Sequence, residues 1–556
     1  LNIMVQLELE KDGAPLKHLA VVQVPRVLPR LIKLPRDDSR QDYIFLAEVI
    51  GHYLGGLFPG TTILGYWAFR VTRNSELYID EEEVANLLKA VENELHNRRR
   101  GDAVRLEVEK DCPQTIRDVL LSTLRLTEDD LYVLDGPINP TRLMAIYECD
   151  HSPELRDPPF VPATALSVRD ETDLFAAIQR RDILLHQPYE AFTTVVEFLE
   201  AAAEDPKVLA IKQTLYRTGG DPRIVGALMK AVKNGKQVTV VVELRARFDE
   251  PNNFLWAGRL EEAGVHVVYG LVGYKIHAKM TLVVRRDDIS IRRYVHLSTG
   301  NYNPTTARLY TDLSLFTARA AIAEDVTNLF NLLTGICQFQ RTEKLIVAPF
   351  EMHKRMLKLI ERETQHAIKG LPARIIAKMN SLVDPDIINS LYHASQAGVK
   401  IDLIVRGICC LVPGVKGLSE NISVRSIVDR FLEHSRIFYF ENACQPEIFI
   451  GSADWMPRNF FRRIETVIPI EDGNLRERIA TGILPVLLGD NVKARILRPD
   501  GSYTFPAPKR TGPARRSQSE FIALASGSKP VRRSTAKKPD YPEMKLRPNP
   551  ISGKAK

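Results

Sequence analysis

The stretch Gly273-Tyr-Lys-Ile-His-Ala-Lys-Met280 lies between two apolar runs and is predicted to be a β-strand. Side chains alternate between the two faces of a strand, so Lys275, His277 and Lys279 would share one face. An imidazole between two ammonium groups favours a bound phosphate, and such an imidazole can attack phosphorus. A strand with a polar outer face would give the same pattern, so the rest of the chain has to decide.

Apolar segments alternate with segments of helical spacing after the first 160 residues. Residues 208–215 and 235–244 are predicted as strands, because they are short and apolar. Residues 192–203 and 224–234 carry apolar side chains at helical spacing and are predicted as helices. Apolar strands that alternate with helices indicate an α/β sheet covered by helices on both faces.

The region that follows repeats this organisation. Gly235 and Gly398 lie 163 residues apart, and each is followed by an apolar run of similar length. The counterpart of His277 is His434, six residues before the position that this offset gives, and it shares a strand face with Arg436. A polar, glycine-containing turn follows each histidine. The sequence therefore predicts two α/β domains related by an internal repeat, each with a His-x-basic motif.

Two histidines in one cleft, each beside a basic residue, suit reactions at phosphorus. A neutral imidazole is a nucleophile, and Lys or Arg stabilises charge on the equatorial oxygens. The second histidine would protonate the leaving oxygen or hold the incoming one. Arg217, Arg247 and Arg406 follow predicted strands, at the sheet edge where ligands of open α/β sheets bind. Guanidinium groups suit bidentate phosphate binding, and Arg458 adds charge after the second glycine turn.

Two reaction classes use these parts. One is hydrolysis or exchange of a phosphodiester, as in the phospholipase D superfamily, and the other is phosphoryl transfer from a nucleotide through a phosphohistidine. The superfamily keeps an Asp five residues beyond its Lys, where this chain has Val284. The second copy has Arg436 in place of Lys, and its glycine turn ends in Asp454 rather than Asn. These departures favour phosphoryl transfer. A polyanion-binding protein without activity is a third hypothesis.

The sequence resembles one family in particular, the polyphosphate kinases of the long, histidine-phosphorylated type, which have phospholipase D-like catalytic repeats. The resemblance covers about residues 1–500 and is most specific between 180 and 465. The phrases that carry it are 182–190 (DILLHQPYE), 211–217 (IKQTLYR), 242–249 (VELRARFD), 275–279 (KIHAK), 306–312 (TARLYTD), 403–407 (LIVRG) and 452–456 (SADWM). It implies an ATP:polyphosphate phosphotransferase that works in both directions.

The resemblance also implies roles for individual residues. His277 would take the γ-phosphoryl group of ATP, become phosphohistidine and pass the group to the end of a polyphosphate chain. Tyr310, Arg406 and His434 match nucleotide-contacting positions. Three roles stay open for His434, which would be a general acid, a nucleotide contact or a second phosphate carrier.

A magnesium–phosphate site is implied at Arg217 and Arg247. Arginine has no lone pair for a cation, so we expect both to contact phosphate beside a Mg²⁺ held mainly by nucleotide oxygens. The predicted catalytic residues are His277, His434, Lys279 and Arg436. The predicted ATP- and phosphate-binding residues are Tyr310, Arg406, His434, Lys275 and Arg458.

Four parts are expected along the chain. Residues 1–160 are predicted to form an α+β head domain, with a helix over 81–100. The family has a further N-terminal domain, and a chain that begins with Leu is expected to lack it. Residues 161–343 and 344–500 would be the two phospholipase D-like domains. Residues 501–556 hold thirteen Lys or Arg and three Asp or Glu, so a basic disordered tail that could contact polyanions is expected.

Composition limits the class of protein. Of the 556 residues, 44% are hydrophobic and 26% charged, as in ordinary globular proteins, and no apolar run approaches the roughly 18 residues that span a bilayer. Six cysteines without a Cys-x-x-Cys pair favour a reducing cytoplasm. Attachment to the membrane surface is a second possible location, and the resemblance implies a homo-oligomer, dimeric or tetrameric.

Overall fold

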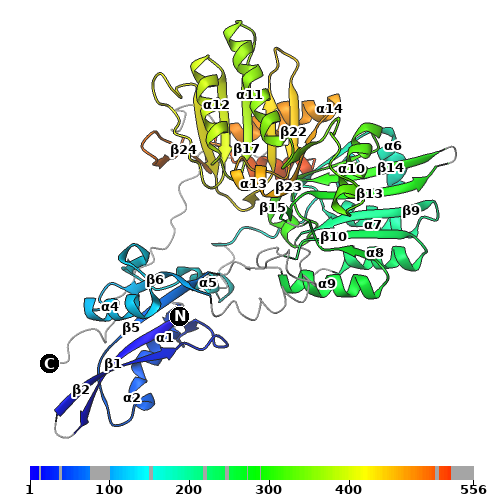
Figure 1. Cartoon of the computed structure of the whole chain (residues 1–556). Helices are drawn as coiled ribbons and strands as arrows, with labels where there is room; N and C mark the ends of the chain where they lie inside the picture. The colour runs from blue at the N-terminus through cyan, green and yellow to red at the C-terminus, as the bar shows by residue number, and fades with distance from the viewer. Residues whose placement is uncertain are drawn as a thin grey trace. The chain divides into compact units, whose positions relative to one another are not determined.

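The computed structural model describes residues 1–11, 14–36, 41–74, 101–149, 155–216, 222–244, 250–271, 273–287, 290–506 and 513–527. Contacts divide the chain into two compact units, Leu1–Pro159 and Phe160–Lys556 (Figure 1). The helix predicted over residues 81–100 lies outside the described residues, as do Arg217 and Arg247.

The first unit is built on a five-stranded sheet in the order β2-β1-β5-β6-β7. Alternate residues of β1 pack on opposite faces: Met4 joins a core with α4, while Ile3 and Val5 join a core with α1 and α2. The bounds are β1 (Asn2–Lys11), β2 (Ala14–Gln23), β3 (Leu31–Lys33), β4 (Tyr43–Phe45), α1 (Leu46–His52), α2 (Leu54–Leu57), β5 (Thr62–Arg73), β6 (Ala103–Glu109), α4 (Gln114–Leu124), η2 (Glu128–Asp130), β7 (Leu131–Leu134), η3 (Pro140–Leu143) and α5 (Met144–Cys149).

The second unit contains two sheets with the same strand order. The first runs β11-β10-β9-β13-β14-β15, with β8 also paired to β15. Its elements are α6 (Leu174–Arg180), β8 (Ile183–Gln187), α7 (Thr193–Glu204), β9 (Val208–Leu215), α8 (Arg223–Lys233), β10 (Gln237–Val242), α9 (Glu250–Glu262), β11 (His266–Val268), β13 (Lys279–Arg286), β14 (Ile291–Ser298), η5 (Thr306–Arg308), β15 (Tyr310–Thr317) and α10 (Ala320–Leu333).

The second sheet runs β19-β18-β17-β21-β22-β23, with β16 also paired to β23, and it extends through β24 and β25. The shared order confirms the α/β fold with an internal repeat. Its elements are β16 (Ile346–Ala348), α11 (Met352–Ile368), β17 (Arg374–Met379), α12 (Pro385–Gln396), β18 (Lys400–Val405), β19 (Ile422–Ile427), β21 (Arg436–Phe440), β22 (Glu447–Gly451), α13 (Pro457–Phe461), β23 (Arg463–Pro469), α14 (Gly473–Glu477), the π-helix η6 (Arg478–Ile483), α15 (Leu484–Leu488), β24 (Ala494–Leu497) and β25 (Tyr503–Thr504).

Helices cover both faces of the first sheet. Met280 and Leu282 of β13 share a buried core with α10 and with side chains of the second sheet. On the opposite face, Phe316 of β15 packs against Phe198 of α7, whose ring also contacts that of Phe175 in α6. The sheet is therefore apolar on both sides, which is why its strands read as nearly continuous hydrophobic runs.

The two repeats exchange short strands. β12 (Lys275–Ile276) pairs in parallel with β23 of the second sheet, and β20 (Leu432–Glu433) pairs in parallel with β15 of the first. His277 follows β12 and His434 follows β20, so both histidines stand at the seam between the repeats. The prediction of one continuous strand from Gly273 to Met280 was therefore wrong, because the chain changes sheets at His277 and Ala278.

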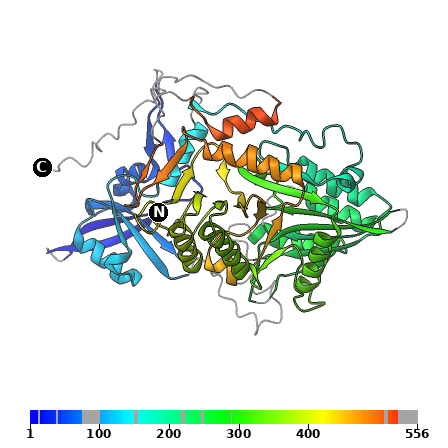
Figure 2. The same ribbon diagram turned by 90° about the horizontal axis from the view of Figure 1, so that it is seen from above.

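Part of the expected disordered tail is folded. Residues 517–525 form α16 (Ser517–Ala525), which lies alongside α15 (Figure 2). Asp490 accepts hydrogen bonds from the backbone nitrogen and hydroxyl of Ser517 at 2.8 and 2.7 Å, and Phe521 is buried. The basic composition misled the prediction here, because these few buried contacts order a short segment within a polar region. No helix among the described residues is long and apolar enough to cross a membrane.

Candidate active site

His277 is buried at the seam and is oriented by a carboxylate from the other repeat. Its Nδ1 lies 2.8 Å from Oε2 of Glu465, in β23. Glu465 is itself fixed, since Oε2 accepts from the Ser452 hydroxyl at 2.5 Å and Oε1 accepts from Nδ2 of Asn459 at 2.7 Å. A carboxylate at Nδ1 selects the tautomer in which Nδ1 donates and Nε2 carries the lone pair. No hydrogen bond reaches Nε2 of His277 from any described residue.

His434 has the reciprocal arrangement. Its Nδ1 lies 2.8 Å from Oδ1 of Asp312, in β15 of the first repeat, and Thr299 donates to the same oxygen at 2.6 Å. The other ring nitrogen differs from that of His277, because Nη1 of Arg436 lies 3.2 Å from Nε2 of His434. In both histidines a carboxylate therefore lies against Nδ1. A guanidinium group lies against Nε2 of His434 but not against Nε2 of His277.

Arg436 connects the second histidine to the glycine turn. Its Nε and Nη2 donate to the two oxygens of Asp454, each at 3.1 Å, and both side chains are buried. Asp454 also accepts from the backbone nitrogen of Asn380 at 2.7 Å. Asp454 and Arg436 thus form a buried two-point ion pair.

The predicted nucleotide contacts lie beside His434. The Tyr310 and His434 rings have centroids 5.2 Å apart, and Arg406 donates to Oδ1 of Asn380 through Nε at 2.9 Å and Nη2 at 2.7 Å. Asn380 in turn donates to the carbonyl oxygen of His434 at 3.0 Å. Arg406 is half-buried, and desolvation together with the charge of Arg436 lowers its pKa.

The remaining predicted cations differ in exposure. Lys279 is fully buried at the start of β13, where its Nζ contacts the carbonyl oxygen of His277 and lies 5.0 Å from the centre of the Tyr216 ring. Lys275 is half-buried in β12, where it lies opposite Arg463 in the parallel strand pairing with β23. Arg458 is exposed in α13 and makes no ion pair with the described carboxylates at the seam.

Burial and positive charge control the protonation of both histidines. Burial, followed by the charges of Lys279, Arg463 and Arg436, holds the pKa of His277 well below its ordinary value of 6.5. These charges come from both repeats, so the two histidines share one electrostatic environment. Burial also lowers the pKa of His434, although Asp312 opposes the shift. Both imidazoles are therefore neutral at neutral pH, as a nucleophile must be.

Burial shifts two further groups at the seam. It lowers the pKa of the Lys279 ammonium well below 10.5, which the nearby Glu465 opposes. It raises the pKa of the Glu465 carboxyl, against the charges of Lys279 and Arg463. An anionic phosphate entering this site would favour the charged form of Lys279.

Sequence reasoning missed the two carboxylates. Asp312 and Glu465 are each the third residue of their strands, β15 (Tyr310–Thr317) and β23 (Arg463–Pro469), which hold the same place in the two sheets. The signal in the sequence was weak, because Asp312 lies 35 residues after His277 whereas Glu465 lies 31 residues after His434. Neither residue is near its histidine in the sequence, so no local motif could have revealed the pair.

The described carboxylates at the seam do not offer a cage for Mg²⁺. Asp312, Glu465 and Asp454 already accept hydrogen bonds from imidazole, hydroxyl, amide or guanidinium groups. Mg²⁺ takes oxygen ligands in octahedral geometry, and in phosphoryl-transfer sites substrate phosphates supply several of them. The donors present therefore fit a Mg²⁺ that arrives with a nucleotide better than one held by the protein alone.

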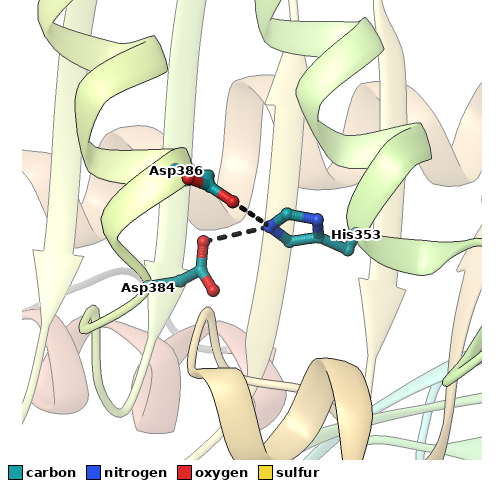
Figure 3. Close-up of side chains that lie close together, drawn as sticks. All are labelled: His353, Asp384 and Asp386. Atoms are coloured by element: carbon teal, nitrogen blue, oxygen red, sulfur yellow. Dashed lines mark hydrogen bonds and ion pairs between the residues drawn. The ribbon is translucent and has the colours of Figure 1, made fainter.

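A His–Asp–Asp cluster lies in the second repeat. Nε2 of His353 in α11 is 3.1 Å from Oδ1 of Asp384 and 3.6 Å from Oδ2 of Asp386 (Figure 3). One imidazole with two carboxylates is a poor match for Mg²⁺, which prefers oxygen ligands. Asp384 is the N-cap of α12 and accepts from the backbone nitrogen of Ile387 at 3.1 Å. These polar contacts explain the cluster, because they connect His353 of α11 to the N-terminus of α12.

Replacing Asp384 with Ala should lower the free energy of unfolding by about 1–2 kcal/mol, because the helix loses its cap and His353 loses a buried partner. Asp386→Ala, at a side chain that is 69% exposed, should change it by at most about 0.5 kcal/mol. Urea-unfolding midpoints of the two variants provide the comparison. Equal midpoints would contradict the capping role.

Models of three polyphosphate kinase domains match successive parts of the chain: the middle domain over residues 1–146, C-terminal domain 1 over 173–339 and C-terminal domain 2 over 345–518. The polyphosphate kinase of Neisseria meningitidis serogroup C is 50% identical over 530 residues, which cover 95% of this chain and 77% of that protein. The polyphosphate kinase of Xylella fastidiosa strain Temecula1 is 53% identical over 512 residues, covering 92% and 73%.

A solved structure gives the same result. The crystal structure of polyphosphate kinase from Porphyromonas gingivalis superposes with a TM-score of 0.82 at 34% identity, covering 95% of this chain and 77% of that one. The two sequence relatives and this structure each cover more than nine-tenths of the chain. The chain therefore belongs to the polyphosphate kinase family of enzymes.

Proposed function

We propose that this enzyme transfers the γ-phosphoryl group of ATP reversibly to the end of inorganic polyphosphate, through a phosphohistidine on His277. The difference between the two imidazoles supports this proposal most directly. Glu465 holds Nδ1 of His277, and no described group bonds to Nε2, whereas Arg436 lies against Nε2 of His434. Of these two imidazoles, only that of His277 thus presents a lone pair to a phosphorus atom without first losing a contact to a described residue.

In the proposed first half-reaction, Nε2 of His277 attacks the γ-phosphorus. The N–P bond forms as the bond from phosphorus to the β–γ bridging oxygen breaks, and ADP leaves. The imidazole ring becomes positively charged, and Glu465 stabilises this charge through its bond to Nδ1. In the second half-reaction a terminal oxygen of polyphosphate attacks the phosphorus, the N–P bond breaks, and neutral His277 is restored. The reverse sequence makes ATP from ADP.

Cations around His277 would stabilise the transferring group. Lys279 and Arg436 act electrostatically on His277, and both are buried, so a phosphoryl group there would be little screened by water. His434 would serve as the acid for the leaving oxygen, as a nucleotide contact or as a second phosphate carrier. Tyr310 and Arg406 beside it would contact the nucleotide, and Lys275 and Arg458 would contact phosphate.

Mg²⁺ is proposed to enter as the nucleotide complex, where it would offset charge on the β- and γ-phosphate oxygens. Arg217 and Arg247, outside the described residues, would contact the same phosphates. ATP or ADP and inorganic polyphosphate are the proposed substrates. We further propose a homo-oligomer in the cytoplasm, with possible attachment to the membrane surface and contact of the basic C-terminal region with polyanions.

Incubating the protein with γ-³²P-labelled ATP and Mg²⁺ tests the proposal. We expect protein-bound label that is lost in acid and stable in base, as for a phosphoramidate, and transfer of that label to added polyphosphate. Adding ADP to the labelled protein should give labelled ATP. Cleavage of a phosphodiester without protein-bound label would favour the diesterase hypothesis, and binding of polyphosphate with neither activity would favour a polyanion-binding protein.

A further inference from the structure

The C-terminal helix α16 is hydrogen-bonded to the segment that precedes His434. Oε1 of Gln518 accepts from the backbone nitrogen of Phe431 at 2.8 Å, and its Nε2 donates to the Phe431 carbonyl oxygen at 2.8 Å. The side-chain amide thus bonds both backbone groups of one residue, as a neighbouring strand would. Its second amide hydrogen goes to Oε1 of Glu433, also at 2.8 Å. Gln518 is 1% exposed, so water does not compete for its hydrogen-bonding groups.

Glu433 connects Gln518 to His434 through two further side chains, Thr311 and Lys378. Its Oε2 accepts from the Thr311 hydroxyl at 3.1 Å and pairs with Nζ of Lys378 at 3.0 Å. Thr311 accepts from the backbone nitrogen of His434 at 3.1 Å, and Lys378 donates to the Ser435 hydroxyl at 2.8 Å. The residues on both sides of His434 are therefore fixed by a buried network, and Gln518 supplies its link to α16.

α16 is anchored independently of this network. Arg516 forms a two-point ion pair with Asp429, through Nε at 2.8 Å and Nη2 at 2.5 Å. Asp490 bonds Ser517 through one carboxylate oxygen, while the other accepts from the backbone nitrogens that begin β24. A helix held in this way can impose a position on the side chains it contacts.

His277 is held differently. The backbone nitrogen of Ile276, the residue that corresponds to Glu433, donates to Oε2 of Glu243 at 2.8 Å. This bond comes from within the first repeat, and no hydrogen bond joins the described residues of this segment to α16. A disturbance of α16 should therefore reach the second imidazole before it reaches the first.

We propose that Gln518 is a positioning residue: through Phe431 and Glu433, α16 sets the place of His434 relative to the phosphoryl group on His277. This inference rests on the proposed function, because it takes His434 as a participant in that transfer. Small displacements of a participating group cost large factors in rate, on the order of 100-fold for about 1 Å.

The test is a double-mutant cycle measured as the single-turnover rate of His277 labelling from γ-labelled ATP. Gln518→Leu keeps the size of the side chain but removes its three hydrogen bonds, and it should slow labelling about 10- to 100-fold. In the His434→Ala background the same substitution should have little further effect, since the group it positions is absent. A merely structural role would slow both backgrounds by the same factor.

Ser519→Ala, at an exposed position of the same helix, is the matched control and should label at the parent rate. If Gln518→Leu does not fold, Arg516→Gln loosens the same helix from Asp429 and takes its place in the cycle. Unchanged labelling in the Gln518 variant, or equal slowing in both backgrounds, would overturn the positioning role. Absence of label in the parent protein would instead overturn the proposed function itself.

Discussion

Protein-bound label from γ-labelled ATP should disappear when His277 is replaced by Ala, and synthesis of polyphosphate should fall by about 10⁴-fold or more, because the atom that accepts the phosphoryl group is lost. His277→Gln should behave the same way, although it keeps a polar side chain of similar length. Scintillation counting of base-treated protein and chromatography of the polyphosphate product measure the two effects.

His266→Ala is the matched control, since this histidine is exposed on β11 in the same repeat. Its labelling should equal that of the parent protein. Acid-labile label that persists in His277→Ala would move the phosphorylated position elsewhere, with His434 the first alternative. Every variant should still unfold cooperatively, with His277→Ala at a lower temperature because buried Glu465 loses a partner, which separates lost chemistry from lost folding.

Glu465→Gln should reduce the rate of His277 labelling by about 100-fold or more. The amide is nearly isosteric, but it lacks the negative charge that stabilises the positively charged phosphoimidazole. It also places an amide donor among groups that already donate, namely Ser452, Asn459 and Nδ1 of His277. The neutral imidazole of His277 would then carry its proton on Nε2 more often. The lone pair on Nε2 would be available less often.

The pH dependence gives this second prediction a separate readout. Burial holds the pKa of His277 well below 6.5, so labelling by the parent protein should stay nearly constant from about pH 8 to below pH 6.5. Glu465 favours the imidazolium form, so removing its charge should lower the pKa further and move the acid limb to still lower pH. An acid limb that moves upward in Glu465→Gln would contradict this orientation of the pair.

Asp312→Asn is the comparison within the other repeat. It makes the same chemical change beside His434, whose Nε2 already faces Arg436. We expect labelling to fall by only about tenfold, because the nucleophile itself is untouched. Equal losses in Glu465→Gln and Asp312→Asn would indicate that the two histidines contribute equally to the first half-reaction.

The residues of the histidine motifs predicted a large part of the site. A His-x-basic pattern found twice, in matching positions of an internal repeat, led to His277 and His434 together. The strand ends likewise led to Arg406, which the structure places beside Tyr310 and His434 through Asn380. The structure brings these residues together because repeated local sequence and apolar periodicity are both properties of the chain itself, while their roles stay predictions.

The sequence by itself determined the α/β class, the repeat and the identity of the two histidines, since these depend on periodicity and on residue type. Only the tertiary structure decided that the repeats exchange strands β12 and β20, which breaks the expected strand at His277. It also decided which carboxylate faces which imidazole, because Glu465 lies 188 residues from His277 along the chain. Contacts between distant segments depend on how two folded sheets meet, and no local pattern records that arrangement.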